Sequence, residues 1–162
     1  MRFYDENGVI RSEMPIKSYR PHRLLFKDNT MYYSISSTSI VCVDSSGYVK
    51  DFYSTGNYSL HHDYIFDTEG NFLVLATKKN DETSEDRIIS INASTKEVTE
   101  IVNLKTVFKN YYTLTKKPSS AETLDWMHIN SLALVGNNSL IISSRETSTI
   151  IKLNTIYTNP SI

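Results

Sequence analysis

The sequence contains little cysteine, proline or glycine. Of its 162 residues, one is cysteine, four are proline and five are glycine. The lone cysteine, Cys42, excludes an internal disulfide framework and a zinc site built from cysteines. Because Cys42 lies in an apolar stretch, we expect it to be buried and unreactive. No apolar run approaches the roughly 20 residues of a membrane span, and the first residues do not form a signal-peptide pattern.

The sequence also lacks an excess of charge of either sign. Seventeen Lys and Arg residues face 18 Asp and Glu residues, a formal net charge of -1. A general nucleic-acid binder would carry a basic excess, so no nucleic-acid partner is expected. A glycine-rich phosphate loop is missing too, and we expect no nucleotide donor and no cofactor. The 40% hydrophobic content, with eleven Tyr and six Phe, is enough for residues 1–162 to form one globular domain.

Two β-prone units alternate along the chain. The first is an apolar strand that ends in Asp or Asn and is followed by a turn. The second is a turn followed by a β-branched or aromatic run. Four short antiparallel strands in about 40–50 residues are typical of a β-propeller blade. The first unit occurs at 2–10, 40–49, 88–98 and 149–154, and the second at 27–35, 68–76 and 135–144.

This repetition predicts an all-β protein with about three to four blades of a larger β-propeller. Two insertions lengthen the repeat: the charged stretch Lys78–Asp86, expected as a solvated loop, and residues 104–123. An irregular β-sandwich is the alternative, because sandwiches also space their strands closely. Three or four blades leave open end faces, so we expect residues 1–162 to be an incomplete propeller. Further chain at both ends, or a second copy in a homo-oligomer, would complete it.

Two histidines occupy matching positions in this repeat. Aligning the turn at Asn71 with the turn at Asn138 places His61 opposite His128. We therefore expect both rings to face one central channel, although a structural role remains the ordinary fate of each histidine alone. Zinc is the rival use of two histidines, but only Asp63 offers a third ligand, and no metal site is expected.

Arg145 directly follows the apolar strand 140–144. An arginine there either caps the strand in solvent or presents its planar fork to phosphate, sulfate or carboxylate. A neutral histidine beside a fixed arginine is suited to transferring a charged group between oxygens.

Two of these segments resemble one enzyme family. Residues 125–131 read Asp-Trp-Met-His-Ile-Asn-Ser, and residues 141–152 contain Ser-Ser-Arg followed by an apolar strand. In this order they resemble the bacterial arylsulfate sulfotransferases. The segment His61-His62-Asp63 matches a further, shorter family segment upstream. The resemblance extends over essentially the whole chain.

The resemblance implies a six-bladed propeller enzyme outside the cytoplasm. Such an enzyme moves a sulfuryl group from a phenolic sulfate donor to a phenol acceptor through a sulfohistidine. It implies catalytic roles for His128, Arg145 and one of His61 or His62, and the repeat alignment prefers His61. His62, Asn130 and Trp126 are expected to contact the substrate. For Trp126, the reason is that alternation along a strand would place it on the same face as His128.

The family's nucleophilic histidine lies past the Ser-Ser-Arg segment, where this chain has no histidine. The remaining histidine, His22, lies in the first blade instead. We therefore expect residues 1–162 alone to hold part of the site and to be inactive. A non-catalytic anion-binding or partner-binding module, and a lyase or hydrolase that uses histidine and a metal, stay open as alternatives.

Overall fold

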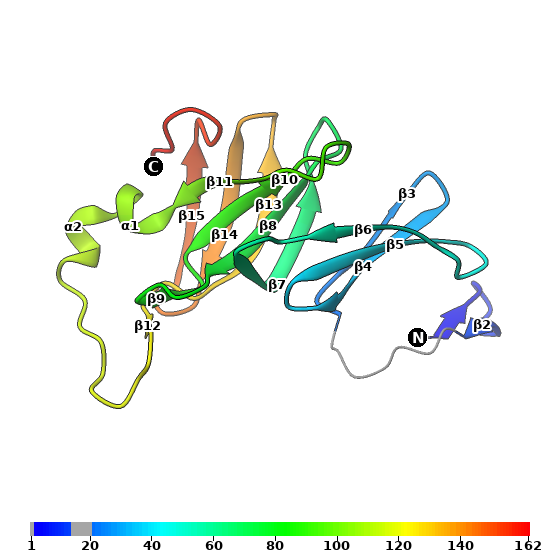
Figure 1. Cartoon of the computed structure of the whole chain (residues 1–162), viewed down its shortest axis with the longest axis horizontal. Coiled ribbons are helices and arrows are strands. Elements are labelled where there is room, and N and C mark those ends of the chain that lie inside the picture. The colour runs from blue at the N-terminus through cyan, green and yellow to red at the C-terminus, as the bar shows by residue number, and fades with distance from the viewer. Residues whose placement is uncertain (1, 14–20) are drawn as a thin grey trace.

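The regular secondary structure of the chain is almost entirely β-strand (Figure 1). The computed structural model describes residues 2–13 and 21–162, and within them no helix is long and apolar enough to cross a membrane. The strands are β1 Arg2–Tyr4, β2 Ile10–Glu13, β3 Leu24–Lys27, β4 Thr30–Ser36, β5 Ser39–Asp44, β6 Val49–Ser54, β7 Tyr58–Phe66, β8 Phe72–Lys78, β9 Thr83–Ser84, β10 Arg87–Ile91, β11 Val98–Asn103, β12 Leu124–Asp125, β13 Ile129–Val135, β14 Ser139–Ser144 and β15 Thr149–Asn154, and the helices are α1 Leu104–Val107 and α2 Lys109–Tyr112.

Three antiparallel sheets follow one another along the chain and lie side by side in Figure 1. We call them the first blade (β3-β4-β5-β6), the second blade (β7-β8-β10-β11) and the third blade (β13-β14-β15). Within each blade, neighbouring strands follow chain order, which is the meander of a propeller blade. The hairpin β1-β2 lies before the first blade, and the parallel pair β9-β12 lies beside the second and third. These sheets confirm the prediction of an all-β, incomplete propeller and argue against a two-sheet sandwich.

One turn geometry explains why the repeats are visible in the sequence. It joins the strands at Asp5–Val9, Asp44–Tyr48 and Asp67–Asn71. In each turn, the aspartate Oδ1 accepts the backbone N–H groups two and four residues further on. The glycine at the fourth position has φ of +76°, +85° and +87° respectively, a conformation that glycine adopts without a steric penalty.

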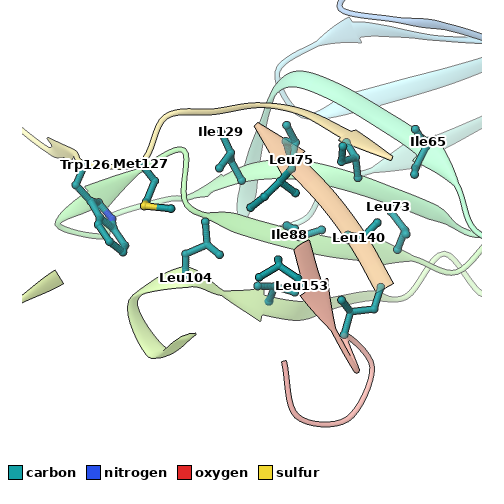
Figure 2. Close-up of a cluster of buried hydrophobic side chains, with 14 residues drawn as sticks. Ile65, Leu73, Leu75, Ile88, Leu104, Trp126, Met127, Ile129, Leu140 and Leu153 are labelled. Atoms are coloured by element: carbon teal, nitrogen blue, oxygen red, sulfur yellow. The ribbon is translucent and has the colours of Figure 1, made fainter. Parts of the chain in front are cut away.

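The second blade is buried on both faces. Along β8, Leu73 and Leu75 contact the third blade, whereas Phe72, Val74 and Ala76 contact the first blade. All five side chains are fully buried, because alternate residues of a strand point to opposite faces. Burying each larger apolar side chain stabilises the fold by about 1.5–3 kcal/mol. Figure 2 shows the core between the second and third blades, and Cys42 is buried in the other core, as predicted.

A carboxylate ties the beginnings of the three blades together. Arg23 directly precedes β3, and its Nη1 donates to Oδ1 and Oδ2 of Asp63 in β7, at 2.8 and 3.0 Å. Asp63 Oδ2 also accepts the backbone N–H of Leu132 in β13, at 3.1 Å. Asp63 therefore links the second blade to the first and third blades near their first strands. It is engaged in these contacts and not, as considered from the sequence, available to a metal ion.

The charged insertion is not simply the solvated loop that the sequence predicts. Its second half turns inward, where Thr83 and Asp86 are fully buried and β9 pairs in parallel with β12. The expectation fails because Asp86 has buried partners: the adjacent Arg87, and Trp126, whose Nε1 donates to Asp86 Oδ2 at 2.8 Å. Charge in a sequence does not imply solvent exposure where such partners exist.

Candidate active site

A bulge in β7 contains the first group of candidate residues. Leu60 pairs with Ala76 and Tyr64 pairs with Val74, so His61, His62 and Asp63 lie opposite a single residue of β8. His62 adopts φ +49°, which breaks the strict alternation of the strand. Bulges re-aim side chains in this way and are frequent beside active sites. Consecutive histidines can therefore approach the same site.

The third blade supplies the second group at the matching end. His128 directly precedes β13 and has φ +47°, close to the value at His62. Arg145 directly follows β14, and its backbone N–H donates to the carbonyl oxygen of His128 at 3.1 Å. The pairing of β13 with β14 thus holds both segments of the family motif at one end of the blade.

All four histidines of the chain gather at this end. The Nε2 atoms of His62 and His128 lie 3.1 Å apart, and their ring centroids are 5.0 Å apart. The ring of His22, from the segment before β3, lies 6.2 Å from that of His62, and the ring of His61 lies 5.4 Å from it. His22, His62 and His128 come from three consecutive blades. Histidines from three parts of the chain therefore lie close together.

The histidine that meets His128 is His62, and not the His61 preferred by the repeat alignment. The alignment counted residues back from the turns, but the β7 hairpin has a longer turn and a larger bulge than the β13 hairpin. His61 is buried, and neither of its ring nitrogens makes a well-formed hydrogen bond within the described residues. Burial, reinforced by the neighbouring His62, lowers the pKa of His61 to about 3, so this ring is neutral at pH 7.

Two carboxylates that the sequence analysis did not assign a role lie against His128. Asp125 Oδ2 is 2.5 Å from His128 Nδ1, and Glu85 Oε2 is 3.0 Å from the same atom. Glu85 Oε2 is also 3.2 Å from His62 Nε2. Burial raises the pKa of Glu85, although the nearby His128 and His62 favour its charged form. The β9-β12 pair brings these carboxylates together, because Glu85 directly follows β9 and Asp125 ends β12.

Arg145 lies at the rim of the same cluster. Its Nη2 is 3.5 Å from Asp125 Oδ2 and 2.8 Å from Glu146 Oε1, and its side chain is 56% exposed. Asn130 and Arg145 line a shallow hollow with Ser143 and Ser148. The arrangement places the exposed guanidinium beside the carboxylate that contacts His128, with Asn130 close to it.

Trp126 has a different place from the one expected. Residues 126–128 are not part of a strand, and the left-handed His128 follows them, so strand alternation does not relate Trp126 to His128. Trp126 is 3% exposed and packs in the core beside Met127 (Figure 2). Its ring lies 5.9 Å from Tyr111 and 5.1 Å from Tyr112. Tyr111 and Tyr112 therefore contact the core, and the structure gives Trp126 a packing role.

Sequence reasoning could have found one of the two carboxylates. Asp125 opens the Asp-Trp-Met-His segment, and a carboxylate three residues before a histidine is a plausible orienting partner. Glu85 carries no comparable signal, because it lies within a run of charged residues that reads as a surface loop.

Comparisons with known proteins agree with this architecture. Among solved structures, the chain is similar to a catalytically inactive variant of virginiamycin B lyase from Staphylococcus aureus, in complex with quinupristin. The two share 13% identity and a TM-score of 0.52, over 93% of this chain and 47% of that one. At this identity the likeness shows the fold alone, and the chain spans about half the length of that protein. No curated protein sequence matches significantly.

A model of one family covers the chain more fully. The family is described as arylsulfotransferase (ASST), and its model matches residues 1–162. The match includes both the Trp-Met-His segment and the Ser-Ser-Arg segment, whose residues meet in the structure. The chain belongs to the arylsulfotransferase family.

Proposed function

We propose that this chain provides the sulfate-binding part of an aryl sulfotransferase. Family membership supports aryl sulfotransferase function in general. The finer proposal is that the enzyme transfers a sulfuryl group from a phenolic sulfate to a phenol through a sulfohistidine. The observation that carries it is the 3.1 Å distance between the Nε2 atoms of His62 and His128. Arg145 lies beside them, with its Nη2 3.5 Å from Asp125 Oδ2.

The residues suit the charge of a sulfate ester. Imidazole N–H groups and a guanidinium are donors, and donors fixed around a sulfuryl group stabilise the charge that develops on its oxygens. Asp125 contacts His128 Nδ1, and a proton held there leaves Nε2 of the neutral ring with its lone pair toward His62; Nε2 donates to a sulfate oxygen only when the ring carries both protons. The carboxylate thereby orients the ring, as carboxylates do beside functional histidines.

The proposed transfer takes place in two steps. In the first, a histidine nitrogen forms a bond to sulfur while the bond from sulfur to the phenolic oxygen breaks, and a phenolate leaves. In the second, the oxygen of the acceptor phenol bonds to sulfur while the nitrogen–sulfur bond breaks, which restores the histidine. The proton that the acceptor loses balances the proton that the released phenolate gains. The expectation that the nucleophilic histidine is not among residues 1–162, and that the chain alone is inactive, stays a prediction.

Replacement of Arg145 by alanine tests the binding role. We expect the affinity of the chain for 4-nitrophenyl sulfate, measured by calorimetry, to fall about 10- to 100-fold. A hydrogen bond to a charged group contributes about 1.5–3 kcal/mol. The matched control is Lys152→Ala, which removes an exposed cation from the same blade and should change the affinity less than about twofold.

The outcomes separate the alternatives. Equal loss in both variants would indicate unspecific attraction to positive charge. Binding that survives Arg145→Ala undiminished would contradict the proposal and favour a non-catalytic module that binds its anion or partner elsewhere.

A further inference from the structure

Several buried polar atoms at the histidine cluster have unmet bonding capacity, and two of them face each other. His61 Nδ1 and Glu85 Oε2 are both shielded from solvent, and neither makes a well-formed hydrogen bond within the described residues. Glu85 Oε2 nevertheless lies close to several nitrogens, so the contacts are short without having hydrogen-bond geometry. Native proteins leave few such atoms unpaired, and binding of an ion is one of the recognised explanations.

The spacing of three of these atoms fits a metal ion. Glu85 Oε2 is 3.2 Å from His62 Nε2 and 4.0 Å from His61 Nδ1, and His61, His62 and Glu85 each have one possible ligand atom within 4.8 Å of those of the other two. A tetrahedral ion with bonds of about 2.0–2.1 Å separates its ligand atoms by about 3.3–3.4 Å, and two such bonds span at most about 4.1 Å. The 3.2 Å distance is close to the tetrahedral separation, whereas the 4.0 Å distance is within the upper limit only, so the His61 ring would move closer to Glu85 when an ion binds.

The backbone explains how neighbouring histidines can serve one ion. In a regular strand, His61 and His62 would point to opposite faces. The β7 bulge and the φ of +49° at His62 remove this restriction, and the two rings approach edge to face with centroids 5.4 Å apart. From the sequence, only Asp63 was considered as a third ligand, because Glu85 lies in the charged insertion.

A second group of possible ligands is spaced for hydrogen bonding instead. Glu85, Asp125 and His128 also lie together. However, the distance of 2.5 Å between His128 Nδ1 and Asp125 Oδ2 is too short for two ligands of one tetrahedral ion. It matches a strong, charge-assisted hydrogen bond. Asp125 therefore serves as a discriminating control.

We propose that His61 Nδ1, His62 Nε2 and Glu85 Oε2 bind one divalent transition-metal cation, with Zn²⁺ as the best match. Two imidazoles and one carboxylate form a set that suits this ion, and three protein ligands leave a fourth position for water or an anion. His62 Nε2 also faces His128 Nε2 at 3.1 Å, and once bound to a metal it cannot donate to a sulfate oxygen. With the cation in place, the sulfate ester would therefore be met by the cation, His128 and Arg145. Metal binding can be measured without an aryl sulfate, so this inference stands or falls separately from the proposed function.

The test is a Zn²⁺ titration of the chelator-treated 162-residue chain, in competition with a chromogenic indicator. We expect one Zn²⁺ per chain. Glu85→Gln, which keeps the shape of the side chain, should weaken Zn²⁺ binding at least about tenfold, and His61→Asn should do the same. Asp125→Asn should stay within about threefold of the unmodified chain. Circular dichroism verifies that each variant is folded.

The outcomes are decisive even if the buried His61 variant does not fold, because Glu85→Gln changes a half-buried residue. Absence of stoichiometric Zn²⁺ binding, or Glu85→Gln binding Zn²⁺ as tightly as the unmodified chain, would overturn the proposal. Loss of Zn²⁺ in Asp125→Asn alone would overturn this choice of ligands. Arg145→Ala should retain Zn²⁺ while losing 4-nitrophenyl sulfate, so that failure of the metal site and failure of the sulfate site give different results.

Discussion

Replacing Arg87 by methionine is expected to lower the free energy of unfolding by about 3–5 kcal/mol. Arg87 is 1% exposed and forms ion pairs with Asp86, with Asp81 at 2.5 Å and with Glu100 at 3.4 Å. Methionine fills much of the same space but removes the positive charge. The fully buried Asp86 carboxylate would then lose the cation that offsets its desolvation.

Urea denaturation at neutral pH measures this loss. Arg145→Met is the matched control, because Arg145 is more than half exposed and its ion pairs should contribute less than about 1 kcal/mol. Adding Asp86→Asn to Arg87→Met should recover part of the lost stability, since the unpaired buried charge is then removed. A loss below about 1 kcal/mol for Arg87→Met would show that the pair is not buried as described.

Replacing Trp126 by alanine should also lower the free energy of unfolding by about 3–5 kcal/mol, the usual loss for a large aromatic residue in a core. Trp126 packs against Tyr111 and Tyr112, and its Nε1 donates to Asp86. Trp126→Phe retains most of the packing. It should cost about 1–3 kcal/mol, mainly because the buried Asp86 carboxylate loses a donor.

The same variants distinguish packing from substrate contact. The structure places Trp126 in the core, so the fraction of Trp126→Phe that is folded should bind 4-nitrophenyl sulfate as the unmodified chain does. Thermal denaturation followed by calorimetry on the folded protein measures both quantities. A stable Trp126→Phe variant with sharply weakened sulfate binding would instead support the substrate-contacting role expected from the sequence.

The blades could be predicted because their turns depend on local chemistry. An aspartate that accepts two backbone N–H groups, followed by a glycine with positive φ, specifies the same turn wherever it occurs. The apolar runs between the turns then predict strands. The apolar strand before Arg145 was predictable in the same way. His128 and Arg145 lie together at one end of the third blade.

The details of the site depend on conformations without a sequence signal. His62 and His128 have positive φ although neither is a glycine, so the sequence gives no sign of it. The bulge in β7 adds residues between His61 and the turn, and the alignment that preferred His61 did not include them. Glu85 enters the site only because β9 pairs with the distant β12. Such pairings depend on tertiary packing, which periodicity within one segment cannot reveal.

The shared anion site is tested most directly by titrating the chain with 4-nitrophenyl sulfate and following the histidine ring signals by NMR. If three blades bring their histidines to one anion site beside Arg145, the signals of His62 and His128 should shift together along one saturation curve. In Arg145→Ala, that shared curve should move to higher ligand concentration. Silent histidine signals at ligand concentrations that saturate binding, or separate curves for His62 and His128, would contradict a shared site.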